Sequence, residues 1–283
     1  MRNTPEISAL MNLIDDPDEV VYASVSTKII SMGREIIPNL ESIWETADNY
    51  ETVKRVEYLI HRVNFQDVLN ELENWAENDE NLVEGALIVS RYFYPDLNLA
   101  PFYKDLEKLR RNIWLELNSY LTPIEKITVF NGIFYNYYKQ SGVEITYDNY
   151  KPFLLNNALE MKKGNAYSNG IIYLILCAML DLPVQAINIP RQFILGYFNN
   201  FNFGQNHEKI VFYIDPLGGN LYSHKDIINY FNKLNVESKE SYFEPVQNKE
   251  IIRILLLELS KCFKEEKDFY KYEDLGSLAA ALA

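Results

Sequence analysis

Three polar residues of this chain, Ser168, Gln192 and Asp215, could together carry nucleophilic chemistry. Ser168 opens a stretch that is apolar on every side, which predicts a helix buried inside the domain. Residues 193–198 and 209–214 are apolar and β-prone, and the Gly- and Asn-containing loop between them predicts a hairpin. If these strands pair symmetrically about the loop, Gln192 faces Asp215. A side chain at a helix N-terminus beside a dyad held by two strands suits nucleophilic catalysis, because the helix dipole favours an anionic nucleophile.

The residue types, however, predict a polar cluster without catalytic power. A serine hydroxyl needs a base to remove its proton, and the Gln192 amide has no proton affinity near neutral pH. Each residue also has a structural interpretation. Ser168 is a good N-cap for the buried helix. Gln192 and Asp215 can satisfy one another, or backbone groups near a strand end.

The other candidate groups lie in less suitable places. His61 belongs to the N-terminal helices, and we expect His207 at the loop end of the hairpin, roughly 26 Å along the strand from Gln192 at about 3.3 Å per residue. His224 follows Asp215 by nine residues. It could fold back toward the site, but a surface position at a helix start is the favoured alternative. Cys177 lies inside the buried helix, so we expect it to be inert core.

The N-terminal third reads as short helices. Asp16 can cap a helix over residues 18–32 whose apolar side chains, Val21, Val25 and Ile29, share one face. A third helix opens near residue 36. This pattern resembles a HEAT repeat, and the alternative is an ordinary helical cap on the domain. An acidic, polar stretch near residues 78–84 is a fair domain boundary.

Several segments in the right order resemble the SirB-one-type family of the transglutaminase-like (papain-fold) superfamily. They are residues 84–95, residues 155–168 (LNNALEMKKGNAYS), residues 180–193 (LDLPVQAINIPRQF) and residues 214–216 (IDP). The resemblance spans about residues 82–260. It implies that Ser168 falls on the nucleophile position, Gln192 on the histidine position and Asp215 on the acid. Only Asp215 keeps the residue type of a Cys-His-Asp triad.

Composition excludes several kinds of partner. The formal net charge of −13 would repel a phosphate backbone or an anionic membrane surface. The most apolar stretch, residues 170–180, is shorter than the roughly 18–20 residues of a membrane span, and the N-terminus does not read as a signal peptide. Two cysteines, Cys177 and Cys262, lie in unrelated contexts without a CxxC pair. This predicts neither a disulfide framework nor a cysteine zinc site, and favours a cytoplasmic location.

The predicted fold is α+β and mostly helical, with a buried central helix packed on a small antiparallel sheet and helical segments on either side. We expect a HEAT-like segment over residues 1–78, a transglutaminase-like domain over 79–245 and a helical extension over 246–283. The predicted function is a non-catalytic protein-interaction or regulatory module, with no cofactor, no metal and a protein partner. The sequence leaves the oligomeric state open. Two rivals remain: a hydrolase or acyltransferase on amide or thioester bonds that uses Ser168, and a peptide or small-ligand pocket at the former active site.

Overall fold

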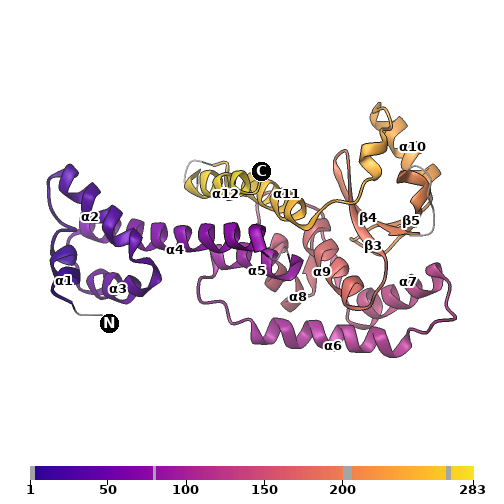
Figure 1. Cartoon of the computed structure of the whole chain (residues 1–283), viewed down its shortest axis with the longest axis horizontal. Coiled ribbons are helices and arrows are strands. Elements are labelled where there is room, and N and C mark those ends of the chain that lie inside the picture. Colours follow the sequence, from indigo (N-terminus) through magenta and orange to yellow (C-terminus); the bar gives the residue numbers. More distant parts are fainter. Residues whose placement is uncertain (1–3, 79–80, 200–205, 266–268) are drawn as a thin grey trace. The chain divides into compact units, whose positions relative to one another are not determined.

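The computed structural model describes residues 4–78, 81–199, 206–265 and 269–283 (Figure 1). The chain divides into two compact units. The first comprises residues 1–74 and 91–95, and the second residues 75–90 and 96–283. The division of the chain into residues 1–78, 79–245 and 246–283 stays a prediction.

The N-terminal unit is helical, as the sequence predicts. It contains α1 (Pro5–Asn12), α2 (Glu19–Ser31), α3 (Ile37–Thr46) and most of α4 (Tyr50–Asn78). The N-cap of α2 is Asp18, which accepts a hydrogen bond from the backbone of Val20, so the expectation of Asp16 as the cap is wrong. Apolar side chains of all four helices form one core, which includes Ile7, Ile14, Val25, Ile29, Ile36, Leu40, Val56, Leu59 and Val63.

The C-terminal unit carries the remaining helices. They are most of α5 (Leu82–Phe93), then α6 (Ala100–Glu116), α7 (Pro123–Asn131), α8 (Leu155–Glu160), α9 (Ala166–Met179), α10 (His224–Leu234), α11 (Asn248–Ser260) and α12 (Phe269–Ala281). Thr122 begins α7 with a reciprocal capping box, as its position before Pro123 predicts. Directly after α7, residues 132–137 adopt a π-helical turn.

Four antiparallel strands form the sheet in the order β3 (Val184–Ile189), β4 (Gln192–Phe198), β5 (Ile210–Ile214) and β6 (Leu221–Tyr222). Leu195 lies opposite Ile214, which is two residues away from the symmetric pairing expected from the sequence. The ladder has an irregularity where β4 ends and β5 begins: Phe198 pairs with Ile210 and Tyr197 with Phe212. Val211 is therefore an extra residue on β5, and a bulge of this kind cannot be read from apolar alternation. A second pair of very short strands, β1 (Ser141–Gly142) and β2 (Lys163–Gly164), is parallel.

Helix α9 is the buried centre of the C-terminal unit. Its residues from Ser168 to Cys177 are all buried, and it packs on β3 and β4 (Figure 1). Gly170 permits this packing, because a Cβ there would lie 2.6 Å from Cε1 of Phe193. The mostly helical α+β fold with a small antiparallel sheet is therefore confirmed. Among the described residues, no helix combines the length and the apolar character needed to cross a bilayer.

Candidate functional site

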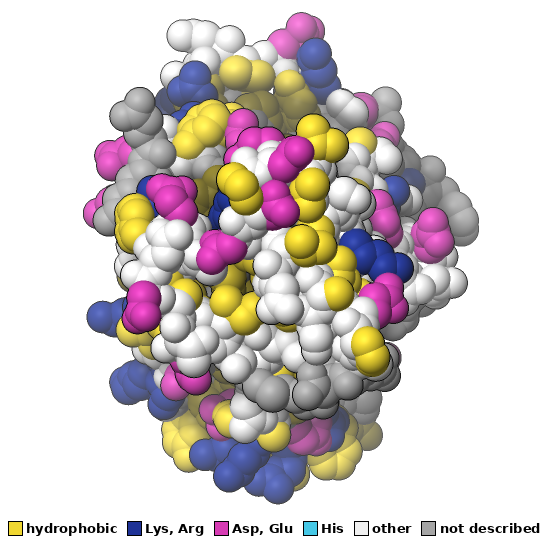
Figure 2. Space-filling view, turned by 90° about the vertical axis from the view of Figure 1, so that its left-hand side faces the viewer, with side chains coloured by type: hydrophobic (Ala, Val, Ile, Leu, Met, Phe, Trp, Pro, Cys, Tyr) yellow, Lys and Arg dark blue, Asp and Glu magenta, His cyan; other side chains and the backbone are white. Residues whose placement is uncertain are grey.

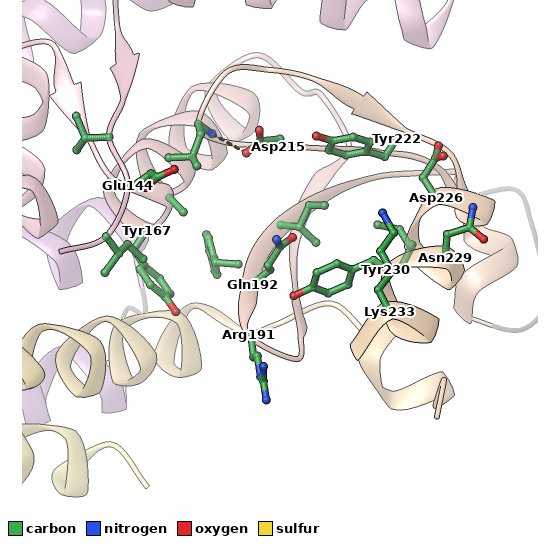
Figure 3. Close-up of a pocket in the computed structure, with 17 residues that line it drawn as sticks. Glu144, Tyr167, Arg191, Gln192, Asp215, Tyr222, Asp226, Asn229, Tyr230 and Lys233 are labelled. Atoms are coloured by element: carbon green, nitrogen blue, oxygen red, sulfur yellow. Dashed lines mark hydrogen bonds between the residues drawn. The ribbon is translucent and has the colours of Figure 1, made fainter. Parts of the chain in front are cut away.

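A cavity of about 570 Å³ lies where the N-terminus of α9, the β3–β4 hairpin, the turn after β5 and helix α10 meet (Figure 3). A loop that follows β1 forms a further part of its wall. The lining includes Val143, Glu144, Ile145, Ala166, Tyr167, Arg191, Gln192, Phe193, Ile194, Asp215, Leu217, Tyr222, Asp226, Ile227, Asn229, Tyr230 and Lys233.

The start of α9 differs from the sequence prediction. Asn165 is the N-cap, and its Oδ1 accepts hydrogen bonds from the backbone N–H groups of Tyr167 and Ser168 at 3.0 and 3.1 Å. The expectation of Ser168 as the cap is therefore wrong. Asn and Ser are equally favoured at N-caps, so residue type alone could not separate these two positions.

Ser168 instead lies in the first turn of α9 and faces the interior. It is 0% exposed, and its Oγ donates a 2.6 Å hydrogen bond to the carbonyl oxygen of Pro152. A Cβ added to Gly164 would lie only 2.5 Å from the same Oγ. Ser168 is thus packed closely between two backbone segments, and it is not among the residues that line the cavity.

Gln192 and Asp215 do line the cavity, but they do not face each other across a strand ladder. Gln192 begins β4 and lies opposite Ile189 on β3, whereas Asp215 directly follows β5. The hairpin that carries Gln192 turns at Arg191, whose φ is +65°, and the Tyr230 hydroxyl donates to the carbonyl oxygen of Pro190 at 3.0 Å. This hydrogen bond ties the hairpin that carries Gln192 to helix α10.

The Asp215 carboxylate is occupied in shaping its own turn. Its Oδ1 accepts a 2.9 Å hydrogen bond from the backbone N–H of Leu217 (Figure 3), and its backbone N–H donates to the carbonyl oxygen of Asn220. In the described part of the chain Asp215 shares no hydrogen bond with Gln192. Of the two alternatives expected for this carboxylate, the pairing with Gln192 is wrong and the bond to a backbone group near a strand end is confirmed.

Helix α7 and the π-helical turn after it donate hydrogen bonds to the turn that follows Asp215. The sequence did not reveal these contacts. Asn131 donates through Nδ2 to the carbonyl oxygen of Gly219 at 2.8 Å, and its Oδ1 accepts from the Tyr173 hydroxyl at 2.9 Å. The Tyr135 hydroxyl donates to the carbonyl oxygen of Pro216 at 2.9 Å. Burial, with the negative charge of Asp215 nearby, raises the pKa of Tyr135 well above its usual range. Tyr135 therefore stays a neutral donor.

None of the three histidines lines the cavity. His224 begins α10, as expected, with its Nδ1 3.0 Å from the Tyr213 hydroxyl oxygen, and its ring stacks on that of His207. His207 Nδ1 lies 2.5 Å from a carboxylate oxygen of Glu240. His61 belongs to the N-terminal unit, where its ring meets the edge of Tyr92. The idea that His224 turns toward the cavity is therefore wrong.

The cavity combines aromatic walls with charged side chains of both signs. Tyr167, Phe193, Tyr222 and Tyr230 supply the aromatic surface, and Figure 3 shows Glu144 far from Lys233. Asp226 is held in the capping box of α10 by Ser223. Such a lining suits an organic ligand or polypeptide segment with apolar and polar groups.

The described ranges contain no group of three or more His, Cys, Asp or Glu residues placed to hold a metal ion. The thiol of Cys177 is fully buried in α9, away from the cavity, and burial raises its pKa well above its usual range. This agrees with the prediction that Cys177 is core.

Sequence comparisons relate the chain to bacterial UPF0162 proteins. The chain is 26% identical over 191 residues to a UPF0162 protein of Vibrio cholerae, covering 66% of this chain and 68% of that protein. It is 28% identical over 131 residues to UPF0162 protein BU173 of Buchnera aphidicola (45% of this chain, 47% of that one). It is 24% identical over 202 residues to UPF0162 protein YchA of Escherichia coli K12 (70% and 72%). No solved structure gives a significant match.

The family model of the transglutaminase-like superfamily matches residues 100–257, which run from the start of α6 through most of α11. That region includes α9, the four-stranded sheet and the whole lining of the cavity. This chain therefore belongs to the transglutaminase-like superfamily.

Proposed function

We propose that this chain is a non-catalytic transglutaminase-like protein of the SirB-one type, which binds an extended segment of a partner protein in the cavity beside α9. One observation carries the proposal. Among the described residues that line the cavity there is no histidine, no cysteine and no serine, so it holds no cysteine or serine nucleophile with a histidine base beside it.

The rival hypothesis, hydrolysis or acyl transfer by Ser168, requires the hydroxyl to reach a substrate. The Ser168 Oγ is buried and donates its proton to the carbonyl oxygen of Pro152. A carbonyl oxygen cannot act as a general base, so this contact does not activate the hydroxyl. The geometry therefore supports a structural role for Ser168.

The lining supports a peptide as the ligand. Aromatic rings give large contact areas with few rotatable bonds, and the side chains of Gln192, Asn229 and Lys233 can pair with backbone and side-chain groups of a bound segment. A small apolar molecule would leave these polar groups without partners. We keep a small polar ligand as the alternative that a binding assay would reveal.

The N-terminal helices would supply a second contact surface, whether or not they form a HEAT-like repeat. Acidic and hydrophobic side chains are interspersed on the face seen from the side of α1–α3 (Figure 2). Among the N-terminal helices Trp44 is 47% exposed, and Val20, Tyr50 and Tyr58 are more exposed still. We further propose a cytoplasmic location, for which the two free thiols are the support.

The test is a selection of peptides from a random display library on the full chain, followed by affinity measurement with fluorescent peptides. Gln192→Trp would fill the cavity from an exposed position, and we expect it to abolish binding. Tyr120→Ala is the matched control, since Tyr120 is 95% exposed and lies outside the cavity. Peptides that bind the Gln192→Trp variant as tightly as the parent would place the binding site elsewhere.

A serine-reactive fluorophosphonate separates this proposal from the hydrolase. We expect no labelling of the folded protein. Labelling that disappears in Ser168→Ala, while the variant keeps its circular dichroism spectrum and melting temperature, would establish a reactive serine and contradict the non-catalytic function.

A further inference from the structure

We propose that Ala166, and not Ser168, stands where the nucleophile of the superfamily acts, so that this chain has lost the nucleophilic side chain altogether. The inference rests on the proposed function, because it concerns the same cavity. It goes further because it identifies Ala166 as the residue at the nucleophile position. It also predicts that the substitution Ala166→Cys would restore a reactive group there.

The first argument is position along α9. Ala166 is the first helical residue after the Asn165 cap, and it is partly exposed and lines the cavity. Ser168 comes two residues later, and successive residues of a helix are turned by about 100°, so the two side chains leave the helix in widely different directions. The direction of Ser168 leads to Pro152.

The second argument is what shares the cavity. Gln192 and Asp215, which the family resemblance puts at the positions of the base and its orienting acid, line the same cavity as Ala166. A catalytic triad must converge on one space where the substrate lies. Ala166 meets this condition and Ser168 does not.

The third argument is electrostatic. The N-terminus of α9, a helix of 14 residues, carries the positive end of the helix dipole. A thiol at the first helical position would have its thiolate stabilised by that field. Cysteines at helix N-termini have pKa values of about 3.5–7.5, compared with about 8.5 for a free thiol. A thiol at position 168 would instead be enclosed, and burial would raise its pKa.

The experiment compares Ala166→Cys with Ser168→Cys in the full chain. Iodoacetamide is added over pH 5–10 and the modified residue is identified by mass spectrometry. In this reaction the thiolate sulfur forms a C–S bond as the C–I bond breaks and iodide leaves, the thiol proton having passed to solvent. The parent provides the background, because Cys177 is buried and burial raises the pKa of Cys262 to about 11.

We expect the thiol introduced at residue 166 to titrate at least one unit below about 8.5 and the one at residue 168 to stay unmodified in the folded protein. Adding Gln192→His should lower the pKa at residue 166 further, through a thiolate–imidazolium pair, and leave residue 168 unchanged. Labelling of both variants in denaturant, together with their melting curves, shows that each thiol is present and each protein folded. If the Ser168→Cys variant misfolds, the test rests on the titration of Ala166→Cys and on its response to Gln192→His.

An ordinary or raised pKa at residue 166 would overturn the inference, as would faster alkylation at residue 168. The peptide-binding measurement is independent of this result. A reactive thiol at residue 166 in a protein that binds no peptide would keep the assignment of Ala166 and refute the proposed function.

Discussion

The imidazole rings of His207 and His224 stack with their centroids 4.9 Å apart and an interplanar angle of 26°. Each ring has a different partner: His207 faces Glu240, and His224 faces the Tyr213 hydroxyl. The ring of Phe243 lies 5.2 Å from that of His224. The pair therefore joins α10 to the end of the sheet at a place outside the cavity, and it should control stability rather than ligand binding.

Stability should fall when the pH drops below about 6.5, the ordinary pKa of histidine. Desolvation, with the His207 ring next in effect, lowers the pKa of His224, while Glu240 acts in the opposite direction. Because the pKa is lower in the folded than in the unfolded state, the contribution of His224 is complete above pH 6.5 and is lost as the pH falls through the folded value. Melting temperatures of the parent between pH 5 and 8 should fall more steeply on the acid side than those of His224→Gln. His61→Gln is the control, and an acid limb unchanged in His224→Gln would contradict this role.

Ser168→Ala should reduce the free energy of unfolding by about 1 kcal/mol and leave peptide binding unchanged. The substitution removes one buried hydrogen bond, but the carbonyl oxygen of Pro152 keeps the N–H of Asn165 as a donor at 3.2 Å. Urea denaturation measures the loss. A large fall in peptide affinity without a comparable fall in stability would show that Ser168 takes part in the site after all.

Gly170→Ala should destabilise the C-terminal unit by about 1–3 kcal/mol, because the new Cβ would overlap the ring of Phe193 at 2.6 Å. This overlap outweighs the gain of roughly 1 kcal/mol that alanine brings to a helix. Gly276→Ala in α12 is the matched control, since its Cβ would have open space, and it should stabilise the protein. Denaturation curves of both variants measure these changes in stability. The double variant Gly170→Ala, Phe193→Leu is the rescue, since its smaller side chain at residue 193 should relieve the overlap.

Asn131→Ala should weaken peptide binding as well as stability. It removes the donor to Gly219 that supports the Asp215 turn, and it leaves the buried Tyr173 hydroxyl without its acceptor, at a cost of about 1–3 kcal/mol. Tyr173→Phe loses only the second of these bonds. We expect it to lower stability while keeping peptide affinity. Equal affinities for Asn131→Ala and Tyr173→Phe would mean that α7 does not position the cavity wall.

The sequence predicted the elements of the core better than their exact contacts. The β4 segment and the buried α9 followed from apolar runs, which burial on all sides requires. The exact register between β4 and β5 could not be predicted, because apolar alternation does not reveal a bulge such as the extra residue at Val211. The orientation of Ser168 was also out of reach, since it depends on which of two good capping residues begins the helix.

The candidate site was predictable only in part, for a related reason. Gln192 begins one recognisable strand and Asp215 directly follows another, and both line the cavity. Asn131 and Tyr135 act through backbone oxygens 88 and 81 residues away, and neither lies in a motif. Long-range support of this kind depends on tertiary packing, which local patterns do not encode.

The chain passes between its two compact units more than once, at residues 74–75, 90–91 and 95–96. Trp75 belongs to the C-terminal unit, where its indole donates to the carbonyl oxygen of Asn81 at 2.8 Å and its ring fills the space above Gly85. A fragment that starts at residue 79 or later would expose the apolar surface that Trp75 covers. Expression of shortened versions should therefore begin before Trp75, and limited proteolysis of the intact protein should not release a stable piece by one cut near residue 79.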